Sequence, residues 1–145
     1  MDVDLLDGRE LNRALDQLGQ SFPRIVGYFR EDGVHAVSTV ERAMRGRDAA
    51  AIVTPAHRLK GEARQLGARL LGDLAERIEM TARLCIERRT GLEDMIAEVA
   101  ELRPCFERTL EALARATYDR SRSLAGRGSA PGFGRKSFLS LLSRP

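Results

Sequence analysis

The sequence predicts an all-α protein: an up-and-down antiparallel four-helix bundle with an additional short N-terminal helix and a flexible C-terminal tail. Apolar residues recur at the three- and four-residue steps of an α-helix in five segments, and no stretch of useful length alternates like a β-strand. The connections between these segments are short, which implies antiparallel neighbours. A length of 145 residues, with 43% hydrophobic and 31% charged residues, suits one domain with a single core.

The first two expected helices follow residues that can cap a helix N-terminus. A short helix is expected from about residue 8 to residue 18, behind Asp7. A long helix is expected from behind Ser21 to about residue 45. Gly33 should weaken the middle of this second helix, because glycine has a low helix propensity.

The third expected helix carries the most regular apolar pattern of the chain. It begins behind Asp48, and Gly67 is expected to end it as a C-cap. Its apolar residues follow one another at steps of four and three: Ile52, Ala56, Leu59, Ala63 and Leu66. Pro55 should bend this helix or remove one of its backbone hydrogen bonds.

Two further helices complete the predicted bundle. The fourth is expected over residues 68 to about 89, and the fifth over residues 92 to about 120. Pro104 interrupts the fifth apolar pattern without ending it, so we predict a kink at this position and a helix that continues beyond it.

The composition changes at residue 123, which divides the chain into a helical domain of residues 1–122 and a basic tail of residues 123–145. The tail is rich in Ser, Gly, Arg and Pro and is expected to be flexible. Its residues 136–144 are either a disordered end or a short amphipathic segment for docking or weak membrane contact. The tail contains four basic residues and no acidic one, so the helical domain has a net charge of −1. Nucleic-acid binding by the domain is therefore not supported.

Several other classes of protein are also disfavoured. No apolar stretch approaches the roughly 20 residues that span a bilayer, and the acidic N-terminus is unlike a signal peptide, so we expect a cytoplasmic protein without an integral membrane segment. Cys85 and Cys105 lack the spacing of a zinc site, so we interpret them as core residues and expect no metal site. No glycine-rich phosphate loop or kinase lysine–glutamate pair is recognisable, which argues against the use of ATP.

A histidine at helical spacing from a lysine and a glycine is the most informative local feature. His57, Lys60, Gly61 and Arg64 lie away from the apolar stripe of the third helix, so His57 should be at least partly exposed. Lys60 is the only lysine of the helical domain, and a compact ammonium suits phosphoryl oxygens. Gly61 costs helix stability but leaves room for a partner beside the imidazole. An idle histidine, a solvated lysine and a glycine for helix packing are the alternatives that remain open.

The run His57-Arg58-Leu59-Lys60-Gly61, followed by Leu66-Gly67-Ala68 and a leucine-rich helix, resembles histidine phosphotransfer (HPt) domains. The resemblance covers roughly residues 5–115. It implies a four-helix bundle in which one helix presents a histidine that accepts and donates a phosphoryl group, and His57 is the matching position. Pro55 and Arg58 depart from the usual pattern of the family, without removing a chemical requirement.

The resemblance also implies a Glu or Gln on the next helix that binds the imidazole, and Glu79 is the matching position. A carboxylate that accepts the Nδ1 proton would fix the tautomer and leave Nε2 as the nucleophile. Glu76, one turn away, is the rival candidate. An ion pair with Arg83 is the alternative role for Glu79.

We therefore expect His57 to exchange a phosphoryl group with an aspartate of response-regulator receiver domains, and Lys60 to neutralise part of the phosphoryl charge. The protein would be a phosphocarrier without a cofactor of its own, and the receiver would supply Mg²⁺. The residues expected to bind the partner are Arg58, Gly61, Arg64 and Arg69.

The expected partners are receiver domains and a hybrid sensor kinase, and the protein is expected to be a monomer. The alternative hypothesis is a helical adaptor that binds a receiver or another signalling domain without carrying phosphate. A fragment of a larger sensor kinase is disfavoured by Met1 and the short length, which we interpret as signs of a free-standing protein.

Overall fold

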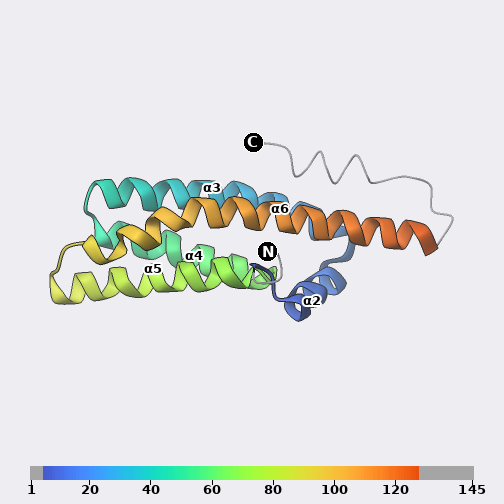
Figure 1. The fold of residues 1–145 in the computed structure, drawn as a ribbon, viewed down its shortest axis with the longest axis horizontal. Helices are drawn as coiled ribbons and strands as arrows, with labels where there is room; N and C mark the ends of the chain where they lie inside the picture. The colour runs from blue at the N-terminus through green and yellow to red at the C-terminus, as the bar shows by residue number, and fades with distance from the viewer. Residues whose placement is uncertain (1–4, 128–145) are drawn as a thin grey trace.

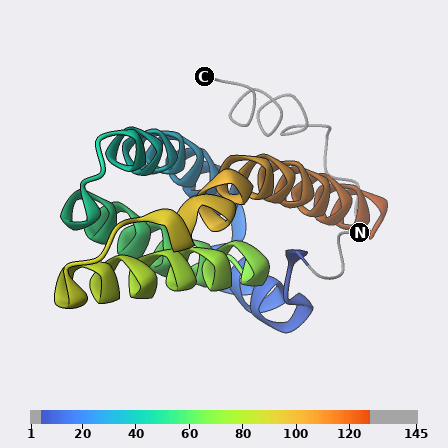
Figure 2. The ribbon, with the colours of Figure 1, turned by 60° about the vertical axis from the view of Figure 1, so that its left-hand side comes forward.

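The computed structural model describes residues 5–127 and consists of four long α-helices side by side with a short helix at one end (Figure 1). The long helices are α3 (Phe22–Arg45), α4 (Ala49–Gln65), α5 (Arg69–Arg88) and α6 (Ile96–Arg127). Each runs antiparallel to the next, and α6 packs against both α5 and α3, which closes the bundle (Figure 2). The short helix α2 (Gly8–Leu18) lies at the end of the bundle where α4 meets α5. The predicted all-α four-helix bundle with an additional N-terminal helix is confirmed.

Two of the three predicted N-cap residues make capping hydrogen bonds. The Asp7 carboxylate accepts hydrogen bonds from the backbone N–H groups of Arg9 and Glu10, at 3.0 and 3.2 Å. The Asp48 carboxylate accepts one from Ala51, at 3.1 Å. Ser21 lies at the N-cap position of α3, as predicted, but its side chain makes no capping hydrogen bond. A short 3₁₀ helix ends at this residue and continues directly into α3, so Ser21 already has helical backbone angles.

Gly67 terminates α4 as predicted and also positions α2. Its φ of +74° is in the left-handed region, and the N–H of the next residue, Ala68, reaches back to the carbonyl of Ala63 at 2.9 Å. A Cβ added at Gly67 would lie 2.6 Å from the backbone nitrogen of Leu11 in α2. The carbonyl of Gly67 also accepts a 2.7 Å hydrogen bond from the N–H of Asp7. Only glycine therefore suits this junction, both for its backbone angles and for the close approach of α2.

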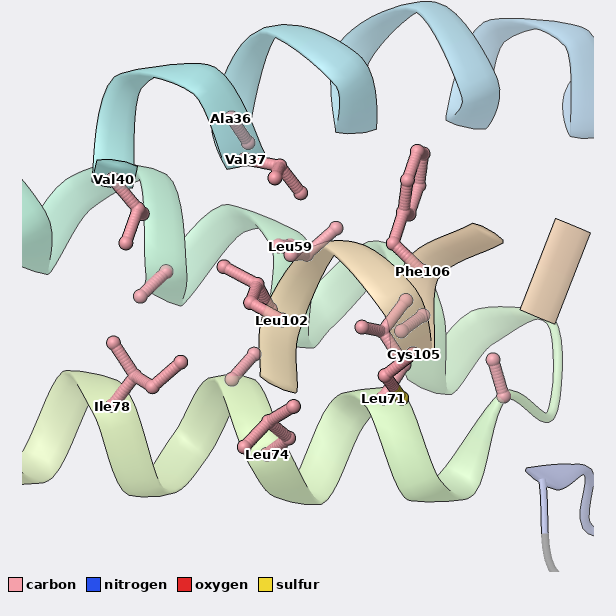
Figure 3. Close-up of a cluster of buried hydrophobic side chains, with 14 of the residues drawn as sticks. Ala36, Val37, Val40, Leu59, Leu71, Leu74, Ile78, Leu102, Cys105 and Phe106 are labelled. Atoms are coloured by element: carbon pink, nitrogen blue, oxygen red, sulfur yellow. The ribbon is translucent and has the colours of Figure 1, made fainter. Parts of the chain in front are cut away.

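The core lies between the four long helices, and each contributes apolar side chains to it (Figure 3). Cys85 and Cys105 are free and buried, which confirms their interpretation as core residues. The expectation that Gly33 merely weakens α3 is incomplete. A Cβ at Gly33 would overlap the ring of Phe106 from α6, so glycine is needed for the close approach of this ring. The labelled side chains that converge in Figure 3 are Ala36, Val37, Val40, Leu59, Leu71, Leu74, Ile78, Leu102, Cys105 and Phe106.

The last helix is longer than the sequence predicts. It continues past Pro104, as expected, but ends at Arg127 and not near residue 120, so residues 123–127 of the predicted tail are helical. An ion pair of 2.9 Å between Arg120, which precedes this extension, and Asp16 joins α6 to α2. The remainder of the predicted tail, including residues 136–144, lies outside the described residues. Within residues 5–127, no helix is long and apolar enough to cross a membrane.

Candidate functional site

The middle of α4 presents His57 on the outer surface of the bundle. Its neighbours Ala56 and Leu59 point into the core, whereas the imidazole side chain is 59% exposed. This difference follows from the helical step of about 100° per residue, which separates the buried stripe from His57. The predicted exposure of this histidine is therefore confirmed, and its ring can be reached from solvent.

A buried carboxylate from α5 meets His57 and Lys60 from α4. The side chain of Glu79 is only 5% exposed, and its Oε2 atom lies 3.0 Å from His57 Nδ1. Its Oε1 atom lies 2.9 Å from Lys60 Nζ, an ion pair without well-aligned hydrogen-bond geometry. The carboxylate thus connects both α4 residues of the sequence motif to the next helix.

Arg83, one turn after Glu79 on α5, binds the same carboxylate. Its Nε and one terminal nitrogen donate hydrogen bonds to Oε2 at 3.1 and 3.0 Å. Sequence reasoning considered an ion pair with Arg83 as an alternative to a role at the imidazole. The structure combines the two, since the oxygen that accepts from Arg83 also faces His57.

Glu76, the rival to Glu79, has a different partner. Its carboxylate accepts a 2.9 Å hydrogen bond from Arg64 of α4, and Asp73 accepts a longer one of 3.4 Å from the same nitrogen. The aliphatic part of Arg64 packs over Gly72, where an added Cβ would lie 2.9 Å from Arg64 Cγ. Arg64 therefore joins α4 to α5, and two carboxylates of this chain already balance its charge.

The charge state of Glu79 determines the tautomer of His57. Burial alone would raise the pKa of Glu79, but contacts with Lys60, Arg83 and His57 outweigh it and lower this pKa to about 2. Glu79 is then ionised at neutral pH and can only accept hydrogen bonds. Nδ1 of the neutral imidazole must therefore carry the proton, which leaves a lone pair on Nε2.

The other predicted partner-binding residues are exposed on α4 and α5. Gly61 is exposed, and a Cβ added there would meet nothing within 4 Å, so this glycine is not required for helix packing. Arg58 is exposed on α4, and Arg69 is exposed at the first position of α5. Among the described residues, no group of three or more His, Cys, Asp or Glu side chains could hold a metal ion.

A comparison with family models matches residues 24–116 to the Hpt domain. The chain belongs to the Hpt domain family. The match includes most of the four-helix bundle and every residue of the site, whereas α2 and the tail lie outside it. Hpt domains are phosphocarriers that interact with receiver domains in phosphorelays.

A solved structure is similar to this Hpt domain in fold. The crystal structure of histidine-containing phosphotransfer protein B (HptB) from Pseudomonas aeruginosa PAO1 matches with a TM-score of 0.70. The match has 22% sequence identity and covers 79% of this chain and 95% of the HptB chain. No curated protein matches the sequence. At this identity the likeness concerns the fold, so the role of each site residue is argued from its own contacts.

Proposed function

We propose that His57 is the phosphoacceptor of this Hpt domain and exchanges a phosphoryl group with an aspartate of a receiver domain. The observation that carries the proposal is the hydrogen bond between His57 Nδ1 and the ionised, buried Glu79. It holds the ring proton on the inner nitrogen, so that Nε2 has its lone pair available. The exposure of the ring allows a partner to approach it.

The transfer is a displacement at phosphorus. The Nε2 lone pair forms the N–P bond while the bond between phosphorus and the aspartyl oxygen breaks, and the aspartate leaves with the electron pair as a carboxylate. The proton on Nδ1 stays on the ring, so the phosphorylated imidazole carries a positive charge that the Glu79 carboxylate stabilises. The reverse displacement returns the phosphoryl group to a receiver.

Lys60 would assist by neutralising charge near the reacting group. Its side chain is 20% exposed and its ammonium is paired with Glu79, so it stabilises the carboxylate before transfer and can turn toward phosphoryl oxygens during it. The Mg²⁺ that offsets the remaining phosphoryl charge would be supplied by the receiver. The protein itself would need neither ATP nor a cofactor.

The docking surface would include Gly61, Arg58 and Arg69, which are all exposed. The open space at Gly61 would let a receiver loop approach His57 closely. Arg64 would contribute less positive charge than the sequence suggests, because Asp73 and Glu76 already bind it. We also propose that the protein is a cytoplasmic monomer and receives its phosphoryl group from a hybrid sensor kinase through a receiver domain.

The decisive experiment compares two histidine substitutions. His57→Gln should abolish phosphoryl uptake from a phosphorylated receiver, whereas His35→Gln, at an exposed position on α3, should leave it intact. The phosphorylation should be acid-labile and stable in alkali, as expected of phosphohistidine. Uptake by His57→Gln at the normal rate would exclude the assignment. A receiver that binds the protein without ever phosphorylating it would favour the alternative, a helical adaptor.

A further inference from the structure

One carboxylate oxygen of Glu79 is in contact with side chains from two helices, Arg83 of α5 and His57 of α4. Oε2 accepts two hydrogen bonds from Arg83 and faces His57 Nδ1, with all three distances between 3.0 and 3.1 Å. An exposed ion pair one turn apart on a helix ordinarily contributes little to stability. This pair differs, because the carboxylate is almost fully buried and belongs to the site.

Each oxygen of the Glu79 carboxylate has a cationic partner. Lys60 of α4 pairs with Oε1, and Arg83 of α5 pairs with Oε2. Since the two cations bind different oxygens, rotation of the carboxylate would break one contact or the other. The orientation that faces Oε2 toward the imidazole is thereby maintained.

We propose that Arg83 is a positioning residue for phosphotransfer: it holds Glu79 Oε2 in line with His57 Nδ1 and, by sharing that oxygen, limits the attraction of the carboxylate for imidazole protons. This inference rests on the proposed function of His57. A carboxylate without this competing donor would favour the doubly protonated imidazolium, which has no lone pair and cannot attack phosphorus.

Other charged side chains of α5 have partners on the neighbouring helices. On the α4 side, Arg64 is bound by Asp73 and Glu76. On the α6 side, Glu98 lies 3.4 Å from Arg77 of α5. Within the described residues, the charges in contact with Glu79 are therefore those of Lys60, Arg83 and, when protonated, His57.

The test uses Arg83→Ala, Arg83→Lys and the control Arg88→Ala, which removes the same charge from an exposed position on the same helix. The titration of the His57 imidazole is followed by ¹⁵N NMR in the unphosphorylated protein, which requires no relay partner. The pH profile of phosphoryl uptake from a phosphorylated receiver is measured in parallel.

Arg83→Ala should move the imidazole titration to higher pH and slow uptake at neutral pH by roughly two- to fivefold, with recovery at alkaline pH. Arg83→Lys should restore part of both, since it retains the charge but not the paired donors. Arg88→Ala should match the wild type. Wild-type titration and pH profile in Arg83→Ala would overturn the inference.

The two proposals fail in different ways. If the imidazole titration shifts as expected but no variant, including the wild type, accepts a phosphoryl group, the contact holds and the proposed function is wrong. If Arg83→Ala does not fold, Arg83→Gln decides the matter, because it removes the charge but keeps most of the aliphatic stem. An unshifted titration in Arg83→Gln, together with a wild-type pH profile, would then reduce Arg83 to a structural ion pair.

Discussion

Among the glutamates that arginine binds in this bundle, Glu41 and Glu79 differ in how many of their carboxylate oxygens the arginine occupies. Glu41 of α3 is bound by Arg103 of α6, whose Nε lies 3.0 Å from Oε2 and whose terminal nitrogen lies 2.7 Å from Oε1. The same arginine also reaches the hydroxyl of Ser38, at 3.3 Å. At Glu79, by contrast, Arg83 covers one oxygen only and shares it with His57.

The difference shows that one arginine–glutamate pair can stabilise the packing of two helices, whereas another can orient a side chain of the functional site. A two-bond pair between guanidinium and carboxylate satisfies both oxygens of Glu41, so it joins α3 to α6 and has no further group to orient. Its hydrogen bond with Arg103 lowers the pKa of Glu41 despite partial burial. Glu79 is buried more deeply and divides its oxygens among three donors, one of which is an exposed imidazole. Because the imidazole is exposed, the contacts of Glu79 orient a side chain that a partner can reach.

Replacing each glutamate by alanine should separate the two roles most strongly. Glu79→Ala should slow phosphoryl uptake by about ten- to a hundredfold, because the imidazole loses the acceptor that fixes its tautomer. Glu41→Ala should leave uptake unchanged and reduce the free energy of unfolding by about 1–2 kcal/mol, since it breaks an interhelical pair. Both variants can be assayed with one phosphorylated receiver and by urea unfolding. Equal losses of phosphoryl uptake in Glu79→Ala and Glu41→Ala would contradict the different roles assigned to the two glutamates.

Acid should also distinguish the pairs, through the ionisation of Glu79. Its pKa is about 2 in the folded protein against an ordinary value of 4.5, so its ionised form stabilises the fold above pH 4.5 and this contribution disappears as the pH falls toward 2. We expect a loss of about 2 kcal/mol, allowing for the exposure of Arg83 and His57. Urea unfolding of Glu79→Gln should show a shallower pH dependence in this range. Glu41→Gln should change the slope less, and a Glu79→Gln profile that parallels the wild type would contradict the expectation.

The sequence predicts most of the fold because helical periodicity alone separates buried from exposed residues. That argument places His57 on the surface and Cys85 and Cys105 in the core. It cannot decide between Glu76 and Glu79, which lie three residues apart on neighbouring positions of one helix face. The choice depends on the register between α4 and α5, which their packing and the turn at Gly67 determine. The assignment of Glu79 therefore came from the family resemblance.

Features that depend on contacts between helices were missed for the same reason. Gly33 has an unfavourable propensity in any helix, and its packing against Phe106 is visible only once α6 is in place. The composition alone assigns residues 123–145 to the tail. Residues 123–127 continue α6 beyond a contact between Arg120 and Asp16, two residues more than 100 positions apart in the sequence.

Substitutions at Gly33, in the α3–α6 region, and at Gly61, beside the site, should have the smallest effects. Gly33→Ala should destabilise the protein by about 1–2 kcal/mol, because the new methyl group collides with the buried Phe106 ring. Gly61→Ala should stabilise it by about 0.5–1 kcal/mol, since alanine favours the helix and meets no neighbour within 4 Å.

Gly61→Gln should likewise fold well but slow phosphoryl uptake, because its longer side chain occupies the space beside His57. Urea unfolding measures stability, and uptake from a phosphorylated receiver measures docking. Normal uptake by Gly61→Gln would mean that the open space at this glycine has no part in receiver binding.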